Sequence, residues 1–233
     1  MQDPLLITTP GGNFAAYVAR PQKFSAPAIV VVHEVFGVNA DMRQSCDELA
    51  AQGYLAICPD LFWRIAPGVD LSDRTEAERV QGLALYNAFD LDAGVNDIAI
   101  TMRAARGLPG VTGKVGVVGY CLGGLLTFLT AARVGTDAAV AFYPGNAEKH
   151  ACEAGHIASP LIVHLAEEDE YIPADAQQEI LSALANRPQI RAYSYPGCGH
   201  AFARHRGISY DAGAAALASG RTADFLAQHL LKD

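Results

Sequence analysis

The hydrophobic residues of this chain fall into short continuous runs separated by stretches of helical length. Six runs rich in Val, Ile, Leu and Ala predict β-strands: residues 28–34 (AIVVVHE), 54–60 (YLAICPD), 114–120 (KVGVVGY), 138–143 (AAVAFY), 161–166 (LIVHLA) and 192–197 (AYSYPG). Because continuous rather than alternating apolar residues indicate strands buried on both faces, these runs predict a mostly parallel sheet.

The segments between these strands carry helical patterns. Apolar residues recur at helical spacing in residues 42–50, which follow an N-cap at Asn39, and again in residues 95–105. Alternation of strand and helix places helices on both faces of the sheet and predicts an α/β fold.

The N-terminal part has a different pattern. Residues 5–19 (LLITTPGGNFAAYVA) predict two short strands around a GGN turn, which would enter the parallel sheet antiparallel. Residues 64–75 form a Pro, Gly and Asp-bearing excursion that we expect at the rim of a cleft. With neither repeats nor linkers, residues 1–233 are expected to form one domain.

Composition narrows the function. A net charge of -8 and a pI near 5.3 argue against a nucleic-acid surface. Neither a membrane-length apolar run nor a secretory leader is visible, so we expect a cytoplasmic protein without membrane contact. The five cysteines are odd in number and scattered, which favours a reducing compartment.

The chemistry centres on GYCLG, residues 119–123. This stretch has the form G-x-nucleophile-x-G, directly after a predicted strand and before a helical pattern, which is the setting of a nucleophile elbow. Such a turn needs glycines beside its central residue, and it aims the next backbone amide at the space above Cys121. The alternative is a buried, inert cysteine in an ordinary turn. Phosphate binding is disfavoured, since no GK[ST] follows.

A nucleophilic thiol needs a base, and the base needs an orienting acid, in that chain order. His200 follows a predicted strand end, at the sheet edge where α/β folds bind ligands, and is the base we favour. The other histidines fit packing or surface roles better; they are His33, His150, His156, His164, His205 and His229. The acid is one of Glu167, Glu168, Asp169 and Glu170, among which the short Asp169 suits a rigid hydrogen bond, although spacing alone does not decide.

At this point the chain resembles a known family. The motifs HEVFGVNADMR, CPDLFWR, GYCLGG, EEDEYIP and GHAFAR, in this order and spacing, are similar to those of the dienelactone hydrolase family of the α/β-hydrolase superfamily. The resemblance runs from about residue 5 to the last helix. It implies the α/β-hydrolase fold and a catalytic triad of Cys121, Asp169 and His200.

The resemblance also implies roles that the residues alone do not show. Glu34 would pair with the resting thiol and help to remove its proton, because only the thiolate attacks; the alternative is a strand-end glutamate paired with an arginine. The backbone amides of Leu122 and Val35 would form the oxyanion hole. Arg79 and Arg204 would hold a substrate carboxylate, for which the guanidinium fork is suited; without the resemblance each would be interpreted as a surface arginine.

Three positions depart from the family pattern. Leu83 stands where members commonly have a tyrosine facing the substrate, and His33 stands where some have glutamine. Trp63 is expected to add bulk near the rim. These differences leave the acyl-transfer residues in place and affect the substrate pocket.

The resemblance predicts an esterase of the carboxymethylenebutenolidase type that opens a small unsaturated lactone in aromatic-compound catabolism. No cofactor or metal is expected, and the chain is expected to be a monomer. Two alternatives are a broader esterase or thioesterase for small esters, and a non-catalytic binding or redox-sensing protein that uses Cys121 and Cys198. A metal site of Cys121, Cys198 and His200 lacks regular ligand spacing.

Overall fold

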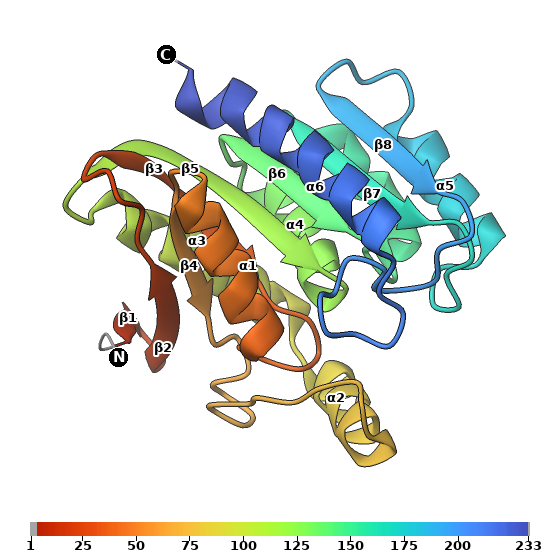
Figure 1. The fold of residues 1–233 in the computed structure, drawn as a ribbon, viewed down its shortest axis with the longest axis horizontal. Helices are drawn as coiled ribbons and strands as arrows, with labels where there is room; N and C mark the ends of the chain where they lie inside the picture. The colour runs from red at the N-terminus through yellow and green to blue at the C-terminus, as the bar shows by residue number, and fades with distance from the viewer. Residues whose placement is uncertain (1–3, 233) are drawn as a thin grey trace.

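The computed structural model describes residues 4–232, which form one eight-stranded sheet with helices on both faces (Figure 1). The strand order is β1-β2-β4-β3-β5-β6-β7-β8. The strands are β1 (Leu5–Thr9), β2 (Gly12–Ala19), β3 (Ala26–Val32), β4 (Leu55–Pro59), β5 (Val111–Tyr120), β6 (Ala138–Phe142), β7 (Leu161–Ala166) and β8 (Ile190–Tyr195). Pairing is parallel from β4 through β8, whereas β1 and β2 pair antiparallel and β2 joins β4 antiparallel. The predicted α/β architecture and antiparallel entry are confirmed.

The predicted strand boundaries need small corrections. His33 and Glu34 lie just beyond β3 rather than inside it, and β5 starts at Val111, before the apolar run. The last strand is β8, which ends at Tyr195 rather than at residue 197. The ends of strands contain polar residues and pair irregularly. A run of apolar residues therefore does not locate the first and last residue of a strand.

The helices are α1 (Ala40–Ala51), α2 (Glu76–Ala88), α3 (Leu91–Arg106), α4 (Leu122–Arg133), α5 (Ala174–Leu184) and α6 (Ala212–Leu226), together with the short segments η1 (Ala147–His156) and η2 (Ala227–Leu231). Figure 1 shows α1 and α6 in front of the sheet, α4 and α5 behind it, and α2 outside both layers. The predicted N-cap is confirmed, since the side chain of Asn39 accepts a hydrogen bond from the Met42 amide (3.1 Å). The apolar positions predicted within residues 42–50 and 95–105 are buried. No helix within residues 4–232 has the length and apolar character that a membrane span requires.

The chain order creates a crevice between β3 and β5. From β3 the chain crosses to β4 on one side, and it later returns to β5 on the other side. Ligands of open α/β sheets bind where the strand order reverses in this way, outside the carboxyl ends of the strands. Because Val32 pairs with Gly119, the residues after β3 and after β5 lie side by side at this point.

The turn from β5 into α4 is too tight for side chains at its glycines. A Cβ added to Gly119 would lie 2.0 Å from the carbonyl oxygen of Gly123, and one added to Gly123 would lie 2.1 Å from that of Val32. Cys121, between them, has φ 55 and ψ -116, outside the ordinary regions for a residue with a side chain. The close packing of backbone on backbone therefore fixes both the glycines and the strained cysteine.

We expect Gly123→Ala to destabilise the protein by about 3 kcal/mol, because the backbone of the turn cannot move away from a new methyl group. Gly220→Ala is the matched control. It lies inside α6 with nothing within 4 Å of an added Cβ, and should gain about 0.5–1 kcal/mol from helix propensity. Urea unfolding of both variants measures the difference, and a Gly123→Ala protein as stable as the wild type would contradict the packing argument.

Candidate active site

Six of the predicted site residues, Arg79 and Arg204 among them, meet at the crevice. A cavity of about 230 Å³ is lined by Cys121 and Leu122 from the turn after β5, by Val35 after β3 and by His200 after β8. Other residues that line it are Phe36, Asp73, Arg79, Leu83, Tyr86, Gly145, Asn146, Glu170, Tyr171, Ala201, Arg204, Ile208 and Ser209. Asp169 and Glu34 lie behind the wall of the cavity. Asp169 contacts His200 and Glu34 contacts Arg204, and both of these contacted residues line it.

The structure singles out one acid from the run of four. The Nδ1 atom of His200 lies 2.8 Å from Oδ2 of Asp169. The other oxygen, Oδ1, accepts hydrogen bonds from the amides of Tyr171 (2.9 Å) and Ile172 (3.1 Å), which hold the carboxylate in place. Asp169 is 4% exposed, whereas Glu167, Glu168 and Glu170 are exposed to solvent. Asp169 is thus the acid that can orient this imidazole.

The electrostatic surroundings favour a charged His200. Burial alone would lower the pKa of His200, but the negative charges of Cys121 and Asp169 outweigh it and raise the pKa to about 10. The Nε2 atom has no hydrogen-bond partner of standard geometry within residues 4–232. The rings of Tyr143 and Tyr171 pack edge-on against the imidazole, with centroids 5.0 and 4.9 Å away. His200 is therefore held by its neighbours, while one nitrogen stays available.

The two residues whose backbone amides the resemblance implies as oxyanion donors, Leu122 and Val35, both line the cavity. The amide of Leu122 is the first of α4, a position that has no acceptor within its own helix. Val35 follows β3, and both residues line the cavity next to Cys121. Donors fixed in this way cost no reorganisation when a carbonyl oxygen gains charge.

A buried charge cluster lies at the wall of the same cavity as the thiol. Arg204 donates from Nε to Oε2 of Glu34 (2.5 Å) and from Nη1 to Oδ2 of Asp73 (2.6 Å). The three side chains are 7% exposed or less. Although burial opposes it, the charges of Glu34 and Asp73 raise the pKa of Arg204 above its ordinary value. The second carboxylate oxygen of Glu34 is buried and unpartnered within residues 4–232. Glu34 is thus paired with an arginine in this structure, which is the alternative interpretation of this residue.

Arg79 has a different setting from Arg204. It is half-buried on α2, and its Nη1 donates to the backbone carbonyl of Asp73 (2.7 Å). Its guanidinium makes no ion pair within residues 4–232. Arg79 therefore offers a cation to the cavity, whereas the cation of Arg204 is already paired with two carboxylates.

Sequence reasoning placed one residue wrongly and missed another. Trp63 does not line the cavity: its ring stacks on Phe14 (5.6 Å) and its Nε1 donates to Asp97 (2.8 Å). The prediction that Trp63 adds bulk near the rim is therefore wrong, because its ring packs against the N-terminal hairpin. Asp73 was not predicted individually, although it belongs to the excursion expected at the rim, and its contact with Arg204 spans 131 residues of chain.

The alternative metal site is not formed. No group of three or more His, Cys, Asp and Glu side chains within the described part of the chain has an arrangement that could hold a metal ion. Cys198, which would belong to such a site or to a redox pair, is 5% exposed and is absent from the cavity wall.

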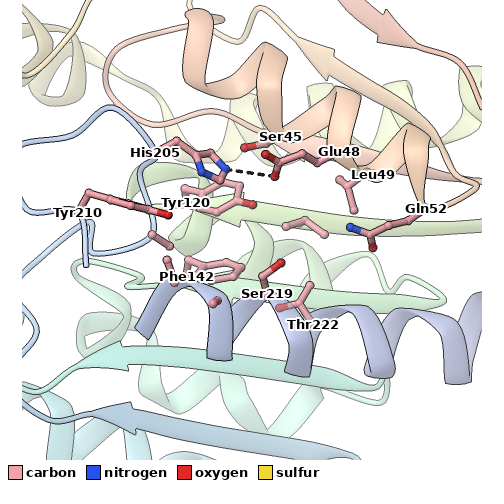
Figure 2. A pocket seen from close by; sticks show the side chains of 14 residues that line it. Ser45, Glu48, Leu49, Gln52, Tyr120, Phe142, His205, Tyr210, Ser219 and Thr222 are labelled. Carbon is pink, nitrogen blue, oxygen red and sulfur yellow. Dashed lines mark ion pairs between the residues drawn. The ribbon is translucent and has the colours of Figure 1, made fainter. Parts of the chain in front are cut away.

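A second cavity of about 190 Å³ lies between α1 and α6, with the stacked rings of Tyr120 and Phe142 as its floor (Figure 2). His205 and Glu48 both line it, and Nε2 of His205 lies 3.1 Å from Oε2 of Glu48. None of the predicted site residues lines this cavity.

Comparison with known proteins agrees with this geometry. Residues 14–230 match the model of the Dienelactone hydrolase family. The chain belongs to the dienelactone hydrolase family. It is 44% identical over 217 residues to the carboxymethylenebutenolidase of Pseudomonas putida, covering 93% of this chain and 92% of that protein. A putative carboxymethylenebutenolidase of Azospirillum brasilense is 44% identical over 221 residues, covering 94% of this chain and 95% of that protein.

Solved structures of the family show the same fold. The structure of a putative dienelactone hydrolase from Klebsiella pneumoniae superimposes with a TM-score of 0.86 at 28% identity, covering 97% of each chain. As a member of the dienelactone hydrolase family, this protein is a carboxylic-ester hydrolase with an α/β-hydrolase fold. The predicted family and fold are confirmed.

The pKa of His200 leads to a pH prediction. Because folding raises this pKa from about 6.5 to about 10, the folded state holds the proton more tightly than the unfolded state. This tighter proton binding stabilises the folded state to its full extent below pH 6.5, and the stabilisation is lost as the pH rises to about 10. We therefore expect the unfolding free energy of the wild type to exceed that of His200→Gln by the largest amount near pH 6. This excess should shrink towards pH 10.

Urea unfolding at both pH values measures this excess. His156→Gln, a change at an exposed histidine on η1, should show no such trend. A wild-type excess over His200→Gln that stays constant between pH 6 and 10 would show that the folded state does not favour the imidazolium.

Proposed function

We propose that this protein hydrolyses a small unsaturated lactone, dienelactone (4-carboxymethylenebut-2-en-4-olide), to maleylacetate through a cysteine acyl-enzyme. The observation that carries the proposal is a thiol at a strained strand-to-helix turn, beside a His200–Asp169 pair, in a chain 44% identical to a carboxymethylenebutenolidase. Cys121 is the nucleophile, His200 the proton-transferring base and Asp169 the orienting acid of this triad.

The reaction follows from the geometry of the cavity. The Cys121 thiolate attacks the lactone carbonyl, and the amides of Leu122 and Val35 stabilise the resulting oxyanion. The acyl carbon–oxygen bond of the ring then breaks and leaves an acyl-enzyme. The imidazolium of His200 gives its proton to the ring oxygen as that oxygen leaves, and the neutral imidazole then takes a proton from the water that attacks the thioester and releases the product.

Glu34 is proposed to generate the thiolate when substrate is present. At rest its carboxylate is held by Arg204, with one oxygen unpartnered. A substrate carboxylate that draws Arg204 away would leave Glu34 as a buried, unpaired base, which is costly unless it takes up a proton. The Cys121 thiol is the proton donor that we propose, so activation depends on the substrate.

Arg79 and Arg204 are proposed to bind the substrate carboxylate. Arg79 can do so at once, because its guanidinium donates only to a backbone carbonyl, whereas Arg204 must exchange partners. The location in the cytoplasm, the monomeric state, the single domain over residues 1–233 and the place in aromatic-compound catabolism stay predictions from the sequence and its resemblance.

Cys121→Ala should abolish lactone hydrolysis, because alanine provides no nucleophile, while the small side chain keeps the fold. The test is the loss of dienelactone absorbance in the ultraviolet with purified protein, for the cis and trans isomers separately. Cys152→Ala, a change at an exposed cysteine outside the cavity, is the control and should keep wild-type turnover. Lactone hydrolysis by folded Cys121→Ala would exclude this nucleophile. Cleavage of simple esters alone by the wild type would point to a broader esterase.

Arg79→Gln should raise the KM for the carboxylated lactone about tenfold, since it removes one charge-assisted contact. The KM for a neutral ester such as phenyl acetate should change little. Steady-state kinetics on both substrates provide the comparison, with Arg103→Gln on α3, away from the cavity, as the matched control. Equal effects of Arg79→Gln on both substrates would argue against a carboxylate contact.

A further inference from the structure

One face of α2 contributes three chemically different side chains to the cavity. Arg79, Leu83 and Tyr86 are spaced four and three residues apart, so they lie on the same side of the helix. All three line the cavity. From Arg79 to Tyr86 the helix rises by about 10 Å. Over this length the face presents a cation, an apolar side chain and a hydroxyl group.

The hydroxyl of Tyr86 has an available proton. Its oxygen accepts a hydrogen bond from the side-chain amide of Asn146, at the start of η1. A phenol can accept and donate at the same time, whereas the NH₂ group of an amide only donates. Within residues 4–232 no protein acceptor takes the Tyr86 proton. This donor therefore has the cavity as its open side.

Tyr86 is close to the reacting thiol. Burial is the main cause that raises the pKa of Tyr86, and the charges of Cys121 and Glu148 add to it, against the opposing hydrogen bond from Asn146. The hydroxyl consequently keeps its proton at neutral pH. Leu83, one turn earlier and 45% exposed, supplies no polar atom at the position where the resemblance leads one to expect a tyrosine.

The oxygens of the lactone can be matched to the donors of the cavity. Under the proposed function, the carbonyl oxygen faces the amides of Leu122 and Val35, and the carboxylate faces the arginines. The ring oxygen is then the lactone oxygen that has no donor among these groups. We propose that Tyr86 donates a hydrogen bond to this ring oxygen, which is the atom that leaves the acyl carbon; the inference rests on the proposed function.

This contact gains strength as the bond breaks. The bond between Sγ of Cys121 and the acyl carbon forms, the bond from that carbon to the ring oxygen breaks, and the electron pair passes to the oxygen. Tyr86 stabilises the negative charge that this oxygen acquires, and Asn146 polarises the phenol by donating to it. Leu83 covers the carbon atoms between the ring oxygen and the carboxylate. Tyr86 is thus a catalytic residue that also selects oxygen esters.

Tyr86→Phe tests the proposal, since it removes only the hydroxyl group. We expect kcat/KM for dienelactone to fall about tenfold. The fall should come from kcat, because the contact strengthens in the transition state. Phenyl acetate should show the same loss. S-phenyl thioacetate should not, because its leaving atom is sulfur, a weak hydrogen-bond acceptor. Tyr210→Phe, which lies in the wall of the second cavity (Figure 2), is the matched control.

The outcomes separate this inference from the proposed function. A fall on the oxygen esters alone supports the hydrogen bond to the leaving oxygen. An unchanged Tyr86→Phe enzyme overturns it, as does an equal loss on ester and thioester, which would indicate that Tyr86 only ties α2 to η1. Wild-type activity on phenyl acetate without dienelactone turnover would reject the lactone substrate, while the ester and thioester pair would still test Tyr86. Absence of turnover on all three substrates would overturn both.

Discussion

The structure depends on the abrupt turn from β5 into α4. The chain reverses direction at Cys121 within one residue, and the backbone around it packs so closely that no side chain fits at Gly119 or Gly123. Buried strands and the helix on either side hold the strained backbone in place, so its cost is met by packing elsewhere. Because the same turn starts α4, the sulfur and the free amide of Leu122 come from one rigid element. The thiol and this amide therefore keep a fixed position relative to each other.

Around this turn the protein distributes charge unevenly. One buried arginine, Arg204, faces two buried carboxylates, those of Glu34 and Asp73, and Asp169 adds a further buried acid beneath His200. Under the proposed function, a substrate carboxylate would compete with Glu34 and Asp73 for Arg204, while Arg79 is open to it. Arg204 can stay buried with its charge because two of its nitrogens donate to carboxylates, one to Glu34 and one to Asp73.

The sequence singled out Cys121 and His200 because each stands at the end of a strand. Cys121 and His200 follow buried runs, and the carboxyl ends of parallel strands share one edge, so their proximity follows from the α/β pattern. The choice of Asp169 among four acids needed the backbone amides of Tyr171 and Ile172, which no spacing reveals. Trp63 and Asp73 were beyond sequence reasoning, because their partners Phe14 and Arg204 come from distant parts of the chain. The functional roles of these residues stay predictions, while the fold and family are established.

His33 shows how a departure from the family pattern can leave a site intact. Its Nε2 accepts a hydrogen bond from the Leu61 amide (3.0 Å), so Nδ1 carries the proton and donates it to the carbonyl of Glu34 (2.6 Å). Burial lowers the pKa of His33 and keeps the ring neutral. A glutamine side chain offers the same pair of groups, an oxygen that accepts and a nitrogen that donates. Histidine and glutamine are therefore interchangeable here in hydrogen-bonding terms, and evolution can exchange one for the other while the backbone beneath Glu34 keeps its place.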